Sequence, residues 1–178
     1  MKRASLLIAF TLLVTASAFA QNSSEIGFLL GGSKRFISGG DKWKVSNSVH
    51  EFWYGYHIEP DTMVKIKAGE ITMPLGDEAT VKATNAEKGR VQHVDLLIDY
   101  RFDEMWGTTG LFAGAGLYRQ RSGPGTAEGT DYGFSAGVNG DFPMTRRYGI
   151  VVEGAYHWIN YSYKPRAITL TGGLRIKL

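Results

Sequence analysis

The chain has 178 residues, a formal net charge of +3 and no cysteine. This length fits a single domain with a core of its own, and so weak a charge does not favour a nucleic acid as partner. The lack of cysteine excludes disulfides, thiol nucleophiles and thiolate metal sites. The 23 glycines, with 9 phenylalanines, 9 tyrosines and 4 tryptophans, are typical of an all-β chain with curved strands.

Residues 1–20 have the three parts of a secretory signal peptide. Lys2 and Arg3 precede an apolar run, and the small-x-small ending Ala-Phe-Ala closes at Ala20. The apolar run is shorter than the roughly 20 residues that a membrane-spanning helix needs. We therefore expect cleavage after Ala20, which leaves residues 21–178 as one domain.

Eight segments of about ten residues follow, in which apolar and polar side chains alternate. They span residues 24–33, 48–58, 63–74, 91–102, 109–120, 131–142, 148–159 and 167–178. Alternation over such lengths indicates β-strands with two distinct faces. The third segment loses its alternation near Gly69, where we expect a β-bulge.

The breaks between these segments alternate in length. The long breaks include residues 34–47, 76–90 and 121–130, and the basic stretch NYSYKPR is a modest fourth. The short breaks hold Pro60, the turn Asp103–Thr108 and the pair Arg146 and Arg147. This pattern is typical of an antiparallel up-and-down barrel with an even number of strands. In outer-membrane barrels the long loops are extracellular and the short turns periplasmic.

The two faces of the segment 91–102 differ in their chemistry. One face carries Val94, Leu96, Ile98, Tyr100 and Phe102, and the other carries His93, Asp95, Leu97, Asp99 and Arg101. In a soluble lipocalin-like barrel the apolar face would line the interior, whereas in a transmembrane barrel it would face lipid. Alternation alone leaves both interpretations open, because the pattern is symmetric under exchange of the faces.

Three further features favour the transmembrane barrel. Aromatic residues gather near the segment ends, as in interfacial girdles: Tyr100, Phe102, Tyr132, Phe142 and Trp158. The apolar face is often wide enough to match the ~25 Å apolar band of such barrels. The polar face carries Gly, Ala, Ser and Thr between its charges, which suits the narrow lumen of an eight-stranded barrel.

The charged residues of the polar face form the candidate site, a lumen charge network. Its predicted members are Glu51, Lys65, Lys67, Asp95, Asp99, Arg101, Asp141, Glu153, His157, Arg175 and Lys177. Apart from the histidine they are five acids and five bases, and buried charges are tolerated only when they are paired. In the lumen we expect Asp95, Asp99 and Arg101 to lie opposite Lys65, Lys67 or Arg175. His157 is expected to hydrogen-bond to Glu153 or to a neighbouring strand, and side chains should leave no open channel.

Three stretches carry a resemblance to a known family: TGLFAGAGLYRQR at 109–121, DYGFSAGVNGDFPMTRRYGIVVEGAYHW at 131–158 and the closing LTGGLRIKL. They resemble the outer-membrane-protein β-barrel domain family, the small eight-stranded barrels of Gram-negative envelopes. The resemblance implies an outer-membrane β-barrel domain over residues 21–178 and a role in adhesion, surface shielding or membrane anchoring.

The same resemblance implies the partners. They are outer-membrane lipid and lipopolysaccharide, and the barrel-assembly machinery, which reads a terminal aromatic residue where this chain has Leu178. Lys164 and Arg166, in the basic fourth loop, are expected to attract lipopolysaccharide phosphates.

Patterns that can carry catalysis have simpler explanations here. Residues 133–137 match G-x-S-x-G, but a strand continues where that motif needs a turn and a helix. His157 and Asn160 are similar to the His-x-Ser-Asn of lipid A deacylases, yet Ile159 replaces the serine, so the histidine has no nucleophile to activate. The four histidines lack the spacing of a metal site.

We therefore predict no catalytic, cofactor or metal site, and a structural, surface-interaction or adhesion role for a barrel with a closed polar lumen. The alternatives are a deacylase-like outer-membrane hydrolase and a periplasmic lipocalin-like carrier.

Overall fold

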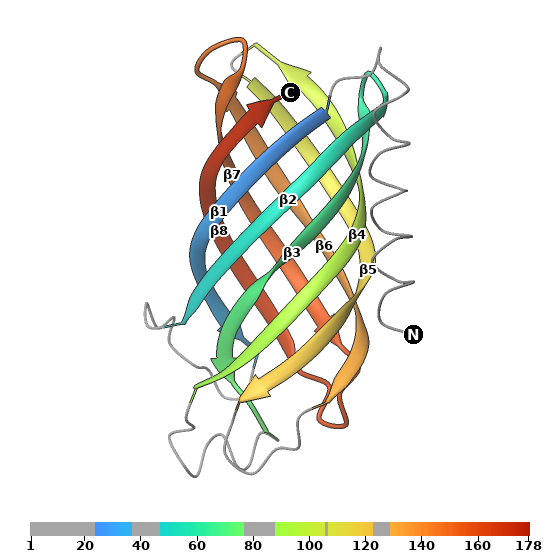
Figure 1. Cartoon of the computed structure of the whole chain (residues 1–178), viewed down its shortest axis with the longest axis vertical. Helices are drawn as coiled ribbons and strands as arrows, with labels where there is room; N and C mark the ends of the chain where they lie inside the picture. Colours follow the sequence, from blue (N-terminus) through green and yellow to red (C-terminus); the bar gives the residue numbers. More distant parts are fainter. Residues whose placement is uncertain (1–23, 37–46, 77–87, 106, 123–128) are drawn as a thin grey trace, which may run out of the picture.

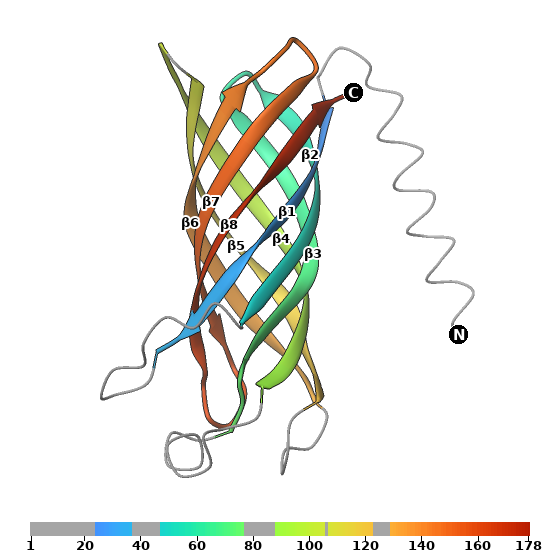
Figure 2. The same cartoon turned by 90° about the vertical axis from the view of Figure 1, so that its left-hand side faces the viewer.

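A computed structural model describes residues 24–36, 47–76, 88–105, 107–122 and 129–178. Eight antiparallel strands close into a barrel, in which each strand pairs with the next and β8 pairs with β1 (Figure 1, Figure 2). The strands are β1 Ser24–Arg35, β2 Ser48–Glu59, β3 Thr62–Pro74, β4 Lys88–Glu104, β5 Gly107–Ser122, β6 Thr130–Pro143, β7 Tyr148–Ile159 and β8 Arg166–Lys177. Within the described ranges, no helix has the length and apolar character needed to cross a membrane.

The connections between strands differ in length at the two ends of the barrel. At one end, which we call the loop end, they span residues 36–47, 75–87, 123–129 and 160–165. At the other, the turn end, they span only 60–61, 105–106 and 144–147. β1 begins and β8 ends beside these short turns (Figure 1). The predicted eight strands and the predicted alternation of long and short breaks are both confirmed.

Apolar side chains cover the outside of the barrel, and charged side chains occupy much of its inside. On β4, Leu96 and Ile98 are 58% and 59% exposed, whereas Asp95 and Asp99 are fully buried. Exposed apolar side chains occur on the other strands as well, among them Phe28, Phe52, Ile66, Leu111, Phe134, Val152 and Leu174. So continuous an apolar exterior suits lipid and not water. The lipocalin-like carrier, which needs the opposite arrangement, does not fit this structure.

β3 keeps a regular register through Gly69, so the predicted bulge at this position is wrong. Gly69 pairs with Glu51 on β2 and with His93 on β4 without a shift. The alternation is lost in the sequence because the inward face of β3 becomes apolar at Ile71 and Met73, which are both fully buried. The glycine instead makes room for β2, because a Cβ at Gly69 would overlap the carbonyl oxygen of His50 and lie 2.8 Å from Cγ of Glu51.

The barrel closes where β8 pairs with β1, and two adjacent glycines differ there. Gly173 pairs with Leu29, and a Cβ at this position would overlap the carbonyl oxygen of Phe28. At Gly172 the nearest atom to a Cβ, the carbonyl oxygen of Val151, would be 3.8 Å away. The close approach of β1 and β8 therefore requires glycine at 173 but not at 172.

Candidate functional site

Two lysines of β3 lie at the centre of the charged interior. Lys65 Nζ is 2.9 Å from Oδ2 of Asp99 and 3.5 Å from Oε2 of Glu153. Lys67 Nζ donates to Oε1 of Glu153 and is 3.7 Å from Oε1 of Glu51. Each of these side chains is at most 2% exposed. Because residues two apart on a strand share a face, both lysines point inward and meet three carboxylates away from water.

Aromatic rings from two other strands flank these lysines. The ammonium group of Lys65 lies 5.1 Å from the ring centre of Trp53 and 5.0 Å from that of Phe112. Lys67 lies 4.9 Å from the ring centre of Phe112. These are cation–π distances, so the rings add a favourable contact for charges that water does not reach.

Glu25 lies among basic side chains at the turn end of the lumen and is not one of the predicted network residues. Its Oε2 is 3.1 Å from Nη1 of Arg101, and its Oε1 is 3.9 Å from Nη1 of Arg175. Oε1 also lies 3.5 Å from Nε2 of His57 and 3.9 Å from Nζ of Lys177. A single fully buried carboxylate thus faces four basic side chains.

The other two aspartates of this region have well-defined partners. Arg175 donates from Nη2 to Oδ1 of Asp141 at 2.9 Å, and its Nε is 2.9 Å from Oδ2, so the guanidinium lies beside both carboxylate oxygens. Asn139 donates from Nδ2 to both carboxylate oxygens of Asp99, at 3.1 and 3.0 Å. Both carboxylates are therefore paired inside the barrel.

Two histidines that are distant in sequence meet on the loop-end side of the lysines. His93 Nδ1 is 2.9 Å from Oδ2 of Asp95. His157 Nδ1 is 3.1 Å from the Tyr118 hydroxyl, and its Nε2 is 3.2 Å from Oγ1 of Thr169 on β8. The two imidazole rings lie 5.7 Å apart. The hydrogen bond of His157 thus goes to a neighbouring strand and not to Glu153, which is one of the two arrangements we predicted.

All the predicted network residues except Lys177 are buried, and Lys177 has a side chain that is 47% exposed at the turn end. Asp99 pairs with Lys65 in the expected way. Asp95 lies in register with Lys67, but its carboxylate contacts His93. The predicted balance of five acids and five bases therefore leaves out three buried groups, Glu25, Arg35 and His93.

Apolar side chains close the lumen at the loop end. This loop-end cap consists of Val49, Ile71, Met73, Leu75, Val91, Tyr118, Ile159, Tyr161 and Ala167. Tyr163 packs against it and donates from its hydroxyl to Oε1 of Gln120 at 2.8 Å. Burial raises the pKa of the Tyr163 hydroxyl to about 12, although the guanidinium of Arg35 nearby acts in the opposite direction. The Tyr163 phenol therefore stays neutral as a hydrogen-bond donor across the physiological pH range.

The turn end is open where the loop end is capped. A cavity of about 760 Å³ lies there, lined by residues of the first turn and by Glu25, Arg101 and Lys177. Its lining mixes both signs of charge, because Asp61 and Asp103 face the same space. The ion pairs of Glu25 form the inner boundary of this mouth.

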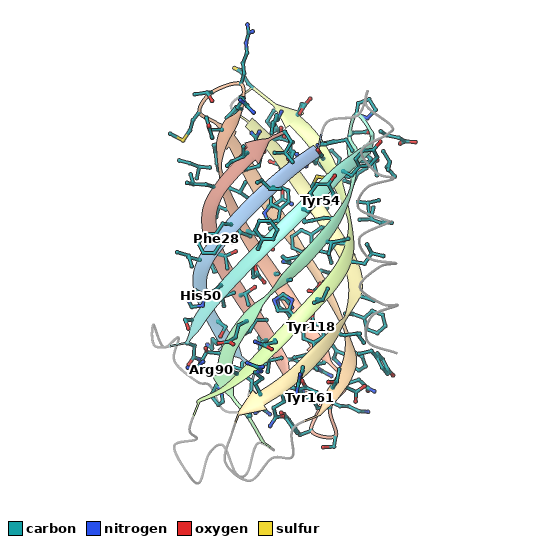
Figure 3. The ribbon with its side chains drawn as sticks, viewed as in Figure 1. Phe28, His50, Tyr54, Arg90, Tyr118 and Tyr161 are labelled. Carbon is teal, nitrogen blue, oxygen red and sulfur yellow. The ribbon has the colours of Figure 1, made fainter. Side chains whose placement is uncertain are left out.

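Basic side chains predominate around the loop end. This basic rim consists of Lys34, Arg90, Arg119, Arg121, Lys164 and Arg166, and Figure 3 shows Arg90 near this end of the barrel. Among the described rim neighbours, Glu70 lies 3.7 Å from Arg90, whose side chain is largely exposed. At the turn end the exposed charges are mixed, because Arg146, Arg147 and Lys177 accompany Glu59, Asp103 and Glu104. The net positive charge of the described barrel surface is therefore larger at the loop end.

No protein-family model and no curated protein sequence matches this chain. Solved structures do match it. The crystal structure of neisserial surface protein A aligns with a TM-score of 0.67 and 17% identity, over 87% of this chain and 97% of that one. The N-terminal β-barrel domain of Pseudomonas aeruginosa OprF aligns with a TM-score of 0.54 and 12% identity, over 88% of this chain and 100% of that one. The chain has the fold of the small outer-membrane β-barrels.

This fold and the apolar exterior place the barrel in the outer membrane of a Gram-negative cell.

The serine and the histidine of the two catalytic sequence patterns are both buried in the barrel interior. Ser135, of the G-x-S-x-G match, is buried within the continuous strand β6, where its hydroxyl donates to Asp95 at 3.4 Å. His157 is fully buried. Asn160 donates its side-chain hydrogen bond to Asp131 and not to His157. The predicted signal peptide at 1–20 falls outside the described residues and stays a prediction.

Proposed function

We propose that this outer-membrane barrel has a closed lumen and acts as a surface-interaction protein. Its partners bind at the loop end, and no solute passes through the lumen. The observation that carries the proposal is the combination of ion-paired side chains along the lumen with the apolar loop-end cap. A solute that crossed the barrel would have to displace buried charges from their partners, which is strongly unfavourable. A structural or adhesive role on the cell surface requires no such passage.

The basic rim supports anionic surfaces as the partner of this loop end. Its six side chains lie where the strands leave the apolar band, so they reach the phosphates of lipopolysaccharide or another polyanion on the outer face. Each basic residue near an anionic membrane surface contributes about 1 kcal/mol of attraction. Lys164 and Arg166 are both exposed and lie at the end of the barrel that the long loops mark as extracellular.

The rim is tested by a pair of substitutions with a matched control. Lys164 has a φ of 40°, a conformation that asparagine tolerates, so Lys164→Asn with Arg166→Gln removes two charges without backbone strain. At about 1 kcal/mol for each charge, we expect lipopolysaccharide affinity to fall about 30-fold at low salt, with a smaller difference at high salt. Arg146→Gln with Arg147→Gln removes the same charge from the turn end and should leave the affinity unchanged. Equal affinities of the rim variant and the unmodified protein would contradict the proposal.

A deacylase-like hydrolase has less support. His157 is enclosed by Tyr118 and Thr169, and Ile159, at the position of the missing serine, is buried in the loop-end cap. A membrane lipid on the outside of the barrel does not reach this histidine. We also propose that the barrel-assembly machinery recognises β8. The backbone N–H of Leu178, the residue after β8, donates to the carbonyl oxygen of Ser24 and holds the end of this strand beside the start of β1.

A further inference from the structure

The lipid-facing surface carries a groove on β5, β6 and β7. Ala113, Ala115 and Ala136 form its floor, and Phe134, Tyr156 and Trp158 form its walls. The groove has a volume of about 460 Å³ and an almost entirely apolar lining. The three alanines are exposed and short, so the barrel surface is recessed here between long aromatic side chains.

The aromatic wall of the groove is held together by ring packing. Phe134 stacks on Trp158 with ring centres 5.6 Å apart, and Tyr132 lies 6.2 Å from Phe134 and 6.3 Å from Trp158. Rings fixed by one another lose little freedom when a ligand lies against them, so the groove is preorganised for a slender apolar group.

Two members of the basic rim lie at the loop-end side of the groove. Arg166 is the register partner of Trp158 across β7 and β8. Arg119 follows Ala115 by four residues on the same outward face of β5, which places it about 13 Å further toward the loop end. An apolar groove inside the membrane thus leads to two exposed cations at its surface.

We propose that this groove binds one acyl chain of an anionic membrane lipid, whose phosphate lies between Arg119 and Arg166. The inference rests on the proposed basic rim and names the class of lipid that the rim holds. Charge complementarity selects the occupant. A second copy of the chain packed across the same face would bring two such pairs of arginines together, which like-charge repulsion disfavours, whereas a lipid phosphate is attracted to both arginines.

Photolabelling in vesicles tests the groove directly. The protein is reconstituted in phosphatidylcholine with a small fraction of phosphatidylglycerol that carries a diazirine in its acyl chain, and the adducts are mapped by mass spectrometry. We expect labelling of Ala113, Ala115 and Ala136 to exceed that of Tyr54 and Ile66, on the opposite apolar face, at least fivefold. Phosphatidylcholine with the same diazirine should label both faces nearly equally.

Two sets of variants separate the apolar and the ionic parts of the site. Ala115→Leu with Ala136→Leu fills the groove with outward apolar side chains and should reduce its labelling to that of the opposite face. Arg119→Gln with Arg166→Gln should abolish the preference for phosphatidylglycerol. Heat-modifiable migration of unboiled protein on a gel verifies that each variant is folded.

Uniform labelling around the barrel or equal labelling of the groove by both lipids would each overturn the inference. Failure of the proposed function has a different signature, which is an unchanged lipopolysaccharide affinity in the Lys164→Asn and Arg166→Gln protein. The two failures are therefore distinguishable.

Discussion

Substitution of Lys67 by methionine is expected to destabilise the barrel by about 3–5 kcal/mol, because it leaves buried carboxylates without their cation. Lys67 donates to Glu153 and faces Glu51, and its side chain is fully buried. Methionine preserves most of the volume, so the loss reflects charge and not a cavity. Urea-induced unfolding of the detergent-solubilised protein, followed by tryptophan fluorescence, measures the change.

The matched control for Lys67→Met is Arg90→Met, which removes a cation beside a glutamate on the surface of the barrel. Arg90 lies 3.7 Å from Glu70, but the Arg90 side chain is 64% exposed. Exposed pairs contribute about 1 kcal/mol or less, so Arg90→Met should change the free energy of unfolding only slightly. If the two methionine variants unfolded at the same urea concentration, the lumen ion pairs would not stabilise the barrel in the way described.

Substitution of Gly173 by alanine is expected to destabilise the barrel by about 1–3 kcal/mol, the usual range for overpacking. The added Cβ would overlap the carbonyl oxygen of Phe28 on β1, and a backbone atom at the closing seam cannot move without disturbing the pairing. Gly172→Ala is the neighbouring control. Its Cβ meets nothing closer than 3.8 Å, and we expect a gain of roughly 0.4–1 kcal/mol from the reduced freedom of the unfolded chain.

The two glycine variants should therefore shift the unfolding midpoint in opposite directions. The measurement is the urea concentration at which heat-modifiable migration is lost, compared with the unmodified protein. Equal shifts for Gly172→Ala and Gly173→Ala would show that close approach of β1 and β8 is not the constraint at this seam.

Much of the fold was predictable from the sequence because alternation is a local signal. The two faces of a strand can be recognised from the residues of that strand alone. Val94, Leu96 and Ile98 lie outward, as their spacing requires. The alternating lengths of the breaks added the arrangement of the two ends. Alternation does not show whether the apolar face meets lipid or the barrel interior. The aromatic residues near the strand ends and the alternating lengths of the breaks favoured lipid.

The details of the lumen depend on contacts between distant strands, and the sequence does not encode them locally. Glu25 joins the network because closure pairs β1 with β8, which brings it opposite Lys177 in register. His93 lies on the predicted polar face, but only the barrel brings it within 3.3 Å of Glu51 on β2. The loss of sequence alternation near Gly69 has a similar origin. At this point the inward face of β3 changes from the charged network to the apolar loop-end cap.

The most direct test of the account is the lipid exposure of one face of β4. The chain has no cysteine, so single cysteines at Val94, Leu96 and Ile98 can carry a nitroxide label without further change. In phosphatidylcholine vesicles we expect all three labels to collide freely with oxygen and hardly at all with a water-soluble nickel complex. A label at the fully exposed Met105, on the β4–β5 turn, should show the reverse. Labels at Val94, Leu96 and Ile98 that were immobile and shielded from oxygen would place this face inside the protein and contradict the account.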